Sequence, residues 1–323
     1  MNIFLVILLF AVGIVLIVKG GDYFVDAASW MAEVSGIPKL IVGATVVSFA
    51  TTLPELLVSA FAAAQGKVDM SIGNAVGSVT ANIGLIMAIA LICMPTAIKR
   101  KDYMLKSCLM LGAALFLVVF GESGELALIP GILLLVIFIV AMAENIHVAR
   151  IGMQEEEREV KEGDKHKPAK KEIAVNIIKF IFGTVGIILG AQLLIDNGSE
   201  LARFIGVPER IIGVTVIAIG TSLPELVTTI SAIVKKQASL SVGNIIGANI
   251  IDLTLILPVS SMIFGGALPI SRQVGMIDLP ACLLIGCIAI IPALITKKFH
   301  RSQGIVLLLT YASYVVITCS GLI

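Results

Sequence analysis

Apolar runs long enough to cross a membrane follow one another along almost the whole of this 323-residue chain. A helix needs about 20 apolar residues to cross the hydrocarbon core of a bilayer. Only 14% of the residues are charged, against about 25% in a soluble domain. The sequence therefore predicts an all-α polytopic membrane protein and excludes an ordinary soluble enzyme. We expect about ten transmembrane helices, at approximately 2–19, 38–65, 71–94, 104–121, 126–147, 173–195, 208–234, 241–264, 275–296 and 303–321.

The two halves of the chain repeat one another at one fixed, gapless offset, so that Pro54 and Pro224, for example, lie 170 positions apart. Such a match over a long stretch indicates an internal duplication. Each half contains an odd number of predicted spans, so the second half enters the membrane from the opposite side. The sequence thus predicts two inverted-topology five-helix repeats. Other matched pairs are Asp26 and Asp196, Pro38 and Pro208, Glu55 and Glu225, Gly73 and Gly243, and Asn74 and Asn244.

A hydrophilic stretch at 150–172 separates the two copies. We expect a first five-helix repeat over 1–149, with its motif at 43–82, and a second over 173–323, with its motif at 213–252. The stretch between them is rich in Glu and Lys, a composition typical of a solvated linker. Roughly twenty residues are too few to form a regulatory domain.

The distribution of Lys and Arg predicts the orientation of the chain. If the N-terminus is outside, the outer loops hold only Lys67, Arg203, Arg210 and Arg272, and the other basic residues lie inside. Short cytoplasmic loops carry an excess of these residues. We therefore expect both termini outside and the 150–172 loop in the cytoplasm. The short chain favours a plasma (inner) membrane over an organelle membrane.

Each copy carries a Pro-Glu pair within a predicted span, preceded by hydroxyl residues. A proline inside a helix removes one amide donor and frees the carbonyl four residues earlier. In lipid, a freed carbonyl must find another partner, and a cation is a suitable one. A carboxylate at mid-span costs at least ~2.5–3.5 kcal/mol and needs a paired charge or a wet cavity. The two segments read Ala50-Thr51-Thr52-Leu53-Pro54-Glu55 and Gly220-Thr221-Ser222-Leu223-Pro224-Glu225.

The next span of each copy opens with a Gly-Asn motif that is rich in side-chain oxygen. Its glycines repeat four positions apart, a spacing that lets another helix approach closely. These glycines are Gly73 and Gly77 in the first copy and Gly243 and Gly247 in the second. The oxygens belong to Asn74, Ser78 and Asn82, and to Asn244, Asn249 and Asp252.

The four motif segments offer carboxylates, carboxamides, hydroxyls and carbonyls, but no thiolate or imidazole. This donor set suits a hard cation such as calcium or sodium, not zinc or copper. Two facing glutamates, Glu55 and Glu225, would offset a divalent charge and would repel one another in an empty site of low dielectric. Such a site should not cross the membrane empty and unprotonated, so calcium movement would be coupled to a second cation. No cofactor is required.

These residues resemble the motifs of the calcium/cation antiporter superfamily, and most closely those of its sodium/calcium exchanger branch, whose repeats carry GTSLPE and GNxxGSNxxN/D. The second copy has GTSLPE in full, and the first differs at Ala50 and Thr52. The resemblance covers both repeats and the ten-span plan. It implies a secondary active transporter and not an enzyme. The implied activity is that of a prokaryotic sodium/calcium antiporter, which extrudes calcium by alternating access with about three sodium ions per calcium.

The resemblance also implies a role for each motif residue. The central ligands of the calcium ion would be the carboxylates of Glu55 and Glu225. Hydroxyls of Thr51 and Thr221 would complete the calcium site. Sodium would use both glutamates, the carbonyls of Val47 and Ala218, and the hydroxyls of Thr51, Thr52, Ser78, Thr221 and Ser222. Supporting positions would be Pro54, Asn74, Asn82, Pro224, Asn244, Asn249 and Asp252.

Three positions depart from the motifs of the branch. Val79 stands in place of an Asn, and Ala248 stands in place of a Ser, which removes one hydroxyl ligand from a sodium site. Asp252 is matched by Asn82 in the first copy, and it either stays protonated beside the glutamates or helps to bind potassium. Gly77 and Gly247 occupy the positions where the proton/calcium branch has Glu, which argues against that branch.

Two alternatives share this scaffold: a potassium-dependent sodium/calcium exchanger and a proton/calcium exchanger. A cation channel is the alternative of a different class, although channels usually build their filters by symmetry between subunits. The expected partners are calcium and sodium ions, with potassium possible, and the lipid bilayer. A net charge of +1 gives no reason to expect nucleic acid, and a monomer is sufficient.

Polar residues near the span ends are expected to be interfacial or helix-capping. The first and sixth spans are related by the repeat and lack motif residues. They would slide as a gate across the core, which is formed by the four spans that carry the motifs (the second, third, seventh and eighth). The polar residues in question are Asp22, Asp26, Glu144, Asn145, Asp196 and Glu200.

Overall fold

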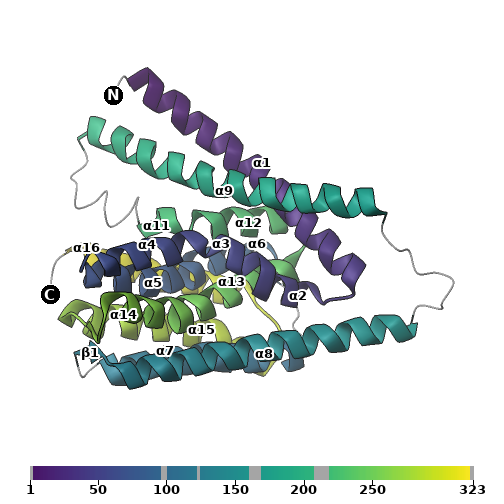
Figure 1. Cartoon of the computed structure of the whole chain (residues 1–323). Coiled ribbons are helices and arrows are strands. Elements are labelled where there is room, and N and C mark those ends of the chain that lie inside the picture. Colours follow the sequence, from purple (N-terminus) through teal and green to yellow (C-terminus); the bar gives the residue numbers. More distant parts are fainter. Residues whose placement is uncertain (1–2, 96–99, 122–123, 160–168, 207–217, 321–323) are drawn as a thin grey trace. The chain divides into compact units, whose positions relative to one another are not determined.

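The computed structural model describes residues 3–95, 100–121, 124–159, 169–206 and 218–320. These residues form helices joined by short turns, with one pair of two-residue strands (Figure 1). The strands β1 (Glu125–Leu126) and β2 (Leu268–Pro269) pair in antiparallel register, with Leu126 opposite Leu268. The predicted helical class is confirmed.

Seven helices of the described chain are long and apolar enough to cross a membrane, or eight if the bent pair Lys39–Thr51 and Leu53–Ala64 counts as one span. The predicted count of ten is not reached among the described residues. Residues 208–217 of the predicted seventh span lie outside them, and the rest of that span forms two shorter helices, α11 (Ala218–Thr221) and α12 (Leu223–Val234). The predicted tenth span is helix α16 (Arg301–Ser320), which is not among the seven.

The chain divides into two compact units that do not coincide with the two repeats. Unit 1 comprises Met1–Thr51 and Ala143–Asn244, and unit 2 comprises Thr52–Met142 and Ile245–Ile323. Each unit therefore takes helices from both halves of the sequence. The repeats describe how the sequence was duplicated, whereas the units describe how the helices pack.

Unit 1 is built around a pair of long helices, α1 (Ile3–Ser35) and α9 (Lys170–Phe204). Both extend well beyond the predicted spans. Phe24 and Phe180 stack between them with ring centroids 4.7 Å apart. The remaining elements of unit 1 are α2 (Lys39–Val42), η1 (Gly43–Val47), α3 (Ser48–Thr51), α11 (Ala218–Thr221), α12, the end of α8 (Leu128–Glu159) and the start of α13 (Ala238–Ile251).

Helices α1 and α9 run antiparallel and touch through their backbones (Figure 1). A Cβ added to Gly20 would lie 2.8 Å from the Ile187 nitrogen, and one added to Gly190 would lie 2.8 Å from the Ile17 nitrogen. These two contacts exchange under the repeat offset, which matches 20 with 190 and 17 with 187. The crossing is therefore symmetric between the two copies, and glycine is required there because a side chain would separate the helices.

Unit 2 contains residues 52–82 of the first motif and residues 245–252 of the second. The Tyr103 and Phe299 rings meet edge to face, with centroids 5.4 Å apart, and α16 packs closely on α6 because Gly304 lies against the Ala88 carbonyl. The helical elements are α4 (Leu53–Ala64), α5 (Val68–Ala81), η2 (Asn82–Met87), α6 (Ala88–Cys93), α7 (Arg100–Gly121), most of α8, the end of α13, η4 (Asp252–Ile256), α14 (Leu257–Phe264), η5 (Val274–Asp278), α15 (Leu279–Thr296) and α16.

The predicted linker at 150–172 is helical at both ends. Helix α8 continues to Glu159, and α9 already begins at Lys170, while 160–168 lie outside the described residues. Trp30 Nε1 donates a hydrogen bond of 2.8 Å to Glu172 Oε1, which fixes the start of α9 to α1. The expectation of a linker loop over the whole stretch is therefore too broad.

Candidate functional site

Both Pro-Glu segments break their helices two residues before the proline. Thr52 separates α3 from α4 with φ −86° and ψ 0°, and Ser222 separates α11 from α12 with φ −85° and ψ 8°. Pro54 and Pro224 then lie in the first turn of the new helix, where a missing amide costs little. The expectation that each proline interrupts a helix interior is wrong, because each one begins a helix.

Glu55 and Glu225 occupy the first turn of α4 and α12, and both side chains are 0% exposed. The N-terminus of a helix carries a partial positive charge and stabilises an anion. The break in each copy thus supplies a favourable place for a buried carboxylate. The hydroxyls of Thr51, Thr52, Thr221 and Ser222 are buried beside these breaks.

In the first copy, Asn74 connects α5 to the turn that carries Glu55. Its Nδ2 donates to the Glu55 carbonyl oxygen at 3.1 Å and to Ser59 Oγ at 2.9 Å. Ser59 and Ser71 each donate to the other's carbonyl oxygen, at 3.1 and 2.8 Å. All four residues belong to unit 2, and their bonds hold α4 and α5 in register.

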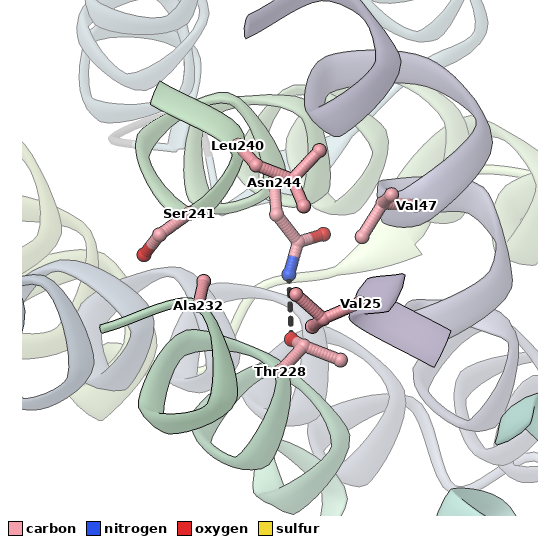
Figure 2. Close-up of a pocket in the computed structure, with 7 residues that line it drawn as sticks. All are labelled: Val25, Val47, Thr228, Ala232, Leu240, Ser241 and Asn244. Carbon is pink, nitrogen blue, oxygen red and sulfur yellow. Dashed lines mark hydrogen bonds between the residues drawn. The ribbon is translucent and has the colours of Figure 1, made fainter. Parts of the chain in front are cut away.

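In the second copy, Asn244 reaches the corresponding turn through a hydroxyl. Asn244 Nδ2 donates to Thr228 Oγ1 at 3.0 Å, and Thr228 Oγ1 donates to the Glu225 carbonyl oxygen at 3.0 Å (Figure 2 shows the first of these bonds). Thr51 Oγ1 donates to Asn244 Oδ1 at 3.2 Å. Unit 1 thereby brings together a hydroxyl of the first motif and an asparagine of the second, as the sequence predicts for a shared site.

A close backbone crossing places Asn244 next to the first motif. A Cβ on Gly43 would collide with the Leu240 carbonyl oxygen, and one on Gly243 would collide with that of Leu40. Gly243 thus behaves as predicted. Gly73 and Gly77 do not, because a Cβ on either would meet nothing within 4 Å.

Asn82 and Asp252, which the repeat matches, each begin a π-helical turn, η2 and η4. Such turns disturb the regular hydrogen-bond ladder and are frequent at functional sites. Asn82 Nδ2 donates to Asn249 Oδ1 at 3.2 Å. All three side chains are buried within unit 2. The π-helical turns are a feature that the sequence reasoning missed.

Several buried oxygens of the motifs make no hydrogen bond within the described part of the chain. They are Ser78 Oγ and Asn82 Oδ1 in unit 2 and Ser222 Oγ in unit 1. Buried polar groups are nearly always satisfied by protein, water or an ion. These oxygens are therefore suited to accept a cation or an ordered water.

The carbonyl ligands expected near the first break are partly engaged. Asn145 Nδ2 donates at 3.3 Å to the Ala44 carbonyl oxygen, in the π-helical turn η1 that contains the buried Val47. Asn145, which was expected to be interfacial or helix-capping, is buried and lies inside α8, so it is not a helix cap. Of the matching segment in the second copy, 214–217 lie outside the described residues, and Ala218 begins α11.

Two of the acids that were expected to be interfacial or helix-capping lie beside a lysine. Asp26 Oδ1 on α1 lies 2.6 Å from Lys235 Nζ at the end of α12, and Asp22 Oδ1 lies 3.8 Å from it. On α9, Asp196 accepts a hydrogen bond from Gln192 at 2.9 Å, and Glu200 pairs with Arg203 at 2.6 Å. All lie inside continuous helices, so none of them is a helix cap.

Asp278 is a buried acid that the sequence reasoning did not select. It ends η5 and accepts a hydrogen bond of 3.0 Å from the Tyr314 hydroxyl on α16. Its position inside a predicted span was the available signal, because acids there are costly and need a partner. It has no acidic counterpart in the first copy, where Cys108 stands.

Among the described residues, no group of three or more His, Cys, Asp or Glu side chains could hold a metal ion. Besides carboxylates, the motif segments offer hydroxyl, amide and carbonyl oxygens. Calcium and sodium accept such mixed oxygen ligands, whereas zinc prefers nitrogen and sulfur.

A model of one family, described as sodium/calcium exchanger protein, matches this chain twice, over residues 5–146 and 175–320. The two matches begin 170 positions apart, which agrees with the offset of the internal duplication. Together they cover nearly the whole sequence, including every motif residue described above.

Similar proteins match almost the full length of the chain. An uncharacterized membrane protein of Methanocaldococcus jannaschii is 30% identical over 308 residues, 94% of each chain. The sodium/calcium exchanger MaX1 of Methanosarcina acetivorans is 29% identical over 350 residues, 97% of each chain.

The fold also matches a solved structure. That structure is the sodium-calcium exchanger NCX_Mj soaked with 2.5 mM Na+ and 10 mM Sr2+, and it is 28% identical in sequence. The match has a TM-score of 0.81 and covers 99% of this chain and 100% of the other. The resemblance of the motifs is confirmed, and this multi-pass membrane protein belongs to the sodium/calcium exchanger family.

Proposed function

We propose that this protein is a sodium/calcium antiporter that moves calcium out of the cell in exchange for sodium by alternating access. The observation that carries the proposal is the set of buried motif oxygens, Ser78 Oγ, Asn82 Oδ1 and Ser222 Oγ, that have no hydrogen-bond partner in the described chain. Buried oxygens of this kind suit a dehydrated hard cation, and each motif also carries a buried glutamate at a helix N-terminus. Family membership supports the same conclusion.

The proposed calcium ligands are the carboxylates of Glu55 and Glu225 with the hydroxyls of Thr51 and Thr221. Two carboxylates balance the charge of one calcium ion. Their complete burial makes two uncompensated negative charges costly, which favours a bound cation at every stage of transport. This cost is the physical basis of coupled exchange.

The proposed sodium ligands are the same two carboxylates and several weaker, neutral oxygens of the motifs. The neutral oxygens are the carbonyls of Val47 and Ala218 and the hydroxyls of Thr51, Thr52, Ser78, Thr221 and Ser222. If sodium and calcium share the glutamates, they compete, and the inward sodium gradient can drive calcium outward. Exchange of about three sodium ions for one calcium would move net charge across the membrane.

The two repeats are proposed to have inverted topology, with both termini outside and the central segment in the cytoplasm. The antiparallel crossing of α1 and α9 supports this, because these helices occupy matching positions in the two copies. The same pair is the proposed gate. The two helices touch through their backbones at the glycines and stack Phe24 on Phe180, so we expect the pair to move as one body.

A potassium-dependent exchanger is the second candidate, and one observation favours it. Asp252 is a third acid buried within the motif segments, at the start of η4, where the first copy has the neutral Asn82. An additional carboxylate is suited to an additional monovalent cation. A proton could take the same place, which would make the protein a proton/calcium exchanger.

Ion fluxes in proteoliposomes test these proposals. Purified protein is reconstituted into liposomes loaded with sodium and diluted into sodium-free buffer that contains radiolabelled calcium. We expect calcium uptake that requires the outward sodium gradient and is faster when the liposome interior is positive, because three sodium ions carry more charge outward than one calcium ion carries inward. Parallel samples with potassium, or with a pH gradient in place of sodium, separate the two alternatives.

That potential dependence has a defined sign. With three sodium ions leaving for each calcium entering, net positive charge leaves the liposome, so a potential that is positive inside accelerates uptake and a negative one slows it. Exchange of fewer than two sodium ions per calcium would give the opposite dependence on potential. Valinomycin-imposed potassium gradients of both signs decide between these ratios.

A further inference from the structure

The hydrogen bonds around Asn244 run in one direction along a chain that joins the two motifs. Thr228 Oγ1 donates to the Glu225 carbonyl oxygen, and Asn244 Nδ2 donates to Thr228 Oγ1, each at 3.0 Å. The Thr51 hydroxyl completes the chain and donates to Asn244 Oδ1 at 3.2 Å. Figure 2 shows Asn244 and Thr228 facing one another across this part of unit 1.

The chemistry of the groups fixes the donor at each step. A carboxamide oxygen only accepts, so the hydrogen bond between Thr51 and Asn244 uses the proton of the Thr51 hydroxyl. The Ser48 carbonyl oxygen, at 3.4 Å, is the more distant of the two acceptors within reach of that proton. Asn244 turns its oxygen to Thr51 because its nitrogen is bonded to Thr228. The Thr228 oxygen accepts that bond because its own proton goes to the Glu225 carbonyl. The lone pairs of the Thr51 oxygen are left available to a cation.

The opposite orientation of the carboxamide would be unfavourable for a cation site. An N–H directed at Thr51 would occupy a lone pair of that hydroxyl and place a positive partial charge near the ion. The hydrogen bond from Asn244 to Thr228 therefore determines that the carboxamide oxygen, and not the nitrogen, faces Thr51 of the first motif.

The surroundings of Asn244 leave it few other partners. The pocket around its side chain has apolar walls formed by Val25 and Val47, with Ala232 and Leu240 beside them (Figure 2). The crossing of Gly43 and Gly243 fixes the backbone on either side. An amide held against apolar walls keeps the hydrogen bonds it has, because unmade ones are costly there.

We propose that Asn244 and Thr228 are positioning residues that hold the Thr51 hydroxyl with its lone pairs toward the transported cation. This inference rests on the proposed function, in which Thr51 is an ion ligand. It assigns the two residues to the sodium affinity of the site and not to the packing of α12 on α13. Neither residue needs to touch the ion.

The first copy of the motif offers a matched control. Val58 stands at the position that corresponds to Thr228, and Asn74 donates directly to the Glu55 carbonyl oxygen. No hydroxyl relay is needed there. A hydroxyl added by Val58→Thr, at a partly exposed position, should therefore leave ion affinity unchanged.

A double-mutant cycle between Thr228 and Thr51 tests the inference. The readout is the sodium concentration that half-maximally drives calcium uptake into proteoliposomes. We expect Thr228→Val to raise it about threefold to tenfold, the range that one net hydrogen bond gives, with an unchanged maximal rate. Thr228→Ser should stay within about twofold of the wild type, because the hydroxyl is retained. In a Thr51→Val background, Thr228→Val should add nothing.

Each other outcome has a defined meaning. If Thr228→Val leaves sodium dependence unchanged, or adds its full effect to Thr51→Val, the relay does not act through Thr51 and the inference is wrong. If wild-type uptake does not depend on sodium, the proposed function fails first. Should Thr228→Val fold poorly, Thr228→Ala removes the same hydroxyl. The cycle can also be measured without transport, as the sodium-induced rise in melting temperature.

Discussion

The α1–α9 crossing and the motif helices have diverged to different extents since the duplication. At the crossing, Gly20 and Gly190 make matching contacts at the same distance in both copies. In the motif helices, Asn74 binds its glutamate turn directly, whereas Asn244 uses Thr228 as a relay. Backbone contact leaves no room for a side chain, so both copies keep glycine. A polar contact can be made in several ways, so the copies could change independently.

The largest expected effect concerns the motif residue that both copies share. Glu55→Gln and Glu225→Gln should each abolish sodium-driven calcium uptake, because one remaining carboxylate cannot offset a divalent charge. Radiolabelled calcium uptake in proteoliposomes measures this. Equal losses would show that the copies are equivalent at the carboxylates.

The matched control for this test is Glu125→Gln, an exposed acid in strand β1. It should keep wild-type uptake. Near-normal flux in both Glu55→Gln and Glu225→Gln would contradict the proposed ligands, and loss in one variant alone would mean that the copies differ even at this position.

The glycine crossing should respond symmetrically to added side chains. Gly20→Ala and Gly190→Ala each place a Cβ 2.8 to 2.9 Å from the backbone of the facing helix. We expect both to lower the free energy of unfolding by about 1–3 kcal/mol, and by similar amounts. Thermal melting in detergent measures the loss.

Gly131→Ala in α8 is the control, because its Cβ would meet nothing within 4 Å. It should not lower the melting temperature. A large difference between Gly20→Ala and Gly190→Ala would show that the two copies relax differently around the crossing, and the symmetry would then be geometric but not energetic.

The sequence was sufficient for the features that repeat or that depend on chemical type. The offset between Glu55 and Glu225, the helical spans and the oxygen-rich motifs all follow from residue identity. Helix length was not predictable in the same way. Asp22 and Asp26 interrupt the apolar run of α1 without ending its helix, because hydropathy reports contact with lipid and not the continuity of backbone hydrogen bonds.

The packing partners of each helix could not be predicted from the sequence, for a related reason. A glycine spacing shows that a helix has a smooth face but not whether another helix occupies it, so Gly73 and Gly77 resembled Gly243 in sequence. Asn145, like Glu144, lies near the end of a predicted span and was therefore expected to be interfacial or helix-capping. Neighbouring residues of a helix point about 100° apart, however, so one can be buried while the other faces outward.

A smaller effect is expected where the copies differ by one hydroxyl. Ala248 is buried in α13 at the position that matches Ser78. Ala248→Ser should restore a ligand, strengthen sodium competition against calcium by about threefold, and leave calcium binding largely intact. Sodium inhibition of calcium uptake measures the change. Unchanged competition would mean that a water or another ligand already fills this position.

The smallest effect is expected at an ion pair that is present in one copy only. Lys235 pairs with Asp26, whereas the matching positions of the second pair are Gln65 and Asp196. Lys235→Gln makes the two copies alike, and because Asp26 is exposed, it should lower the free energy of unfolding by less than about 1 kcal/mol. Thermal melting at low and high salt measures this loss. High salt should abolish the difference between the variant and the wild type, because it screens the ion pair in the wild type.

A larger loss that persists in high salt would identify a different stabilising contact, the hydrogen bond from Lys235 Nζ to the Asp22 carbonyl oxygen. A bond to a backbone carbonyl does not depend on the charge of either aspartate. The asymmetry between the copies would then lie in how α12 is attached to α1, and not in the charges that the repeats have gained or lost.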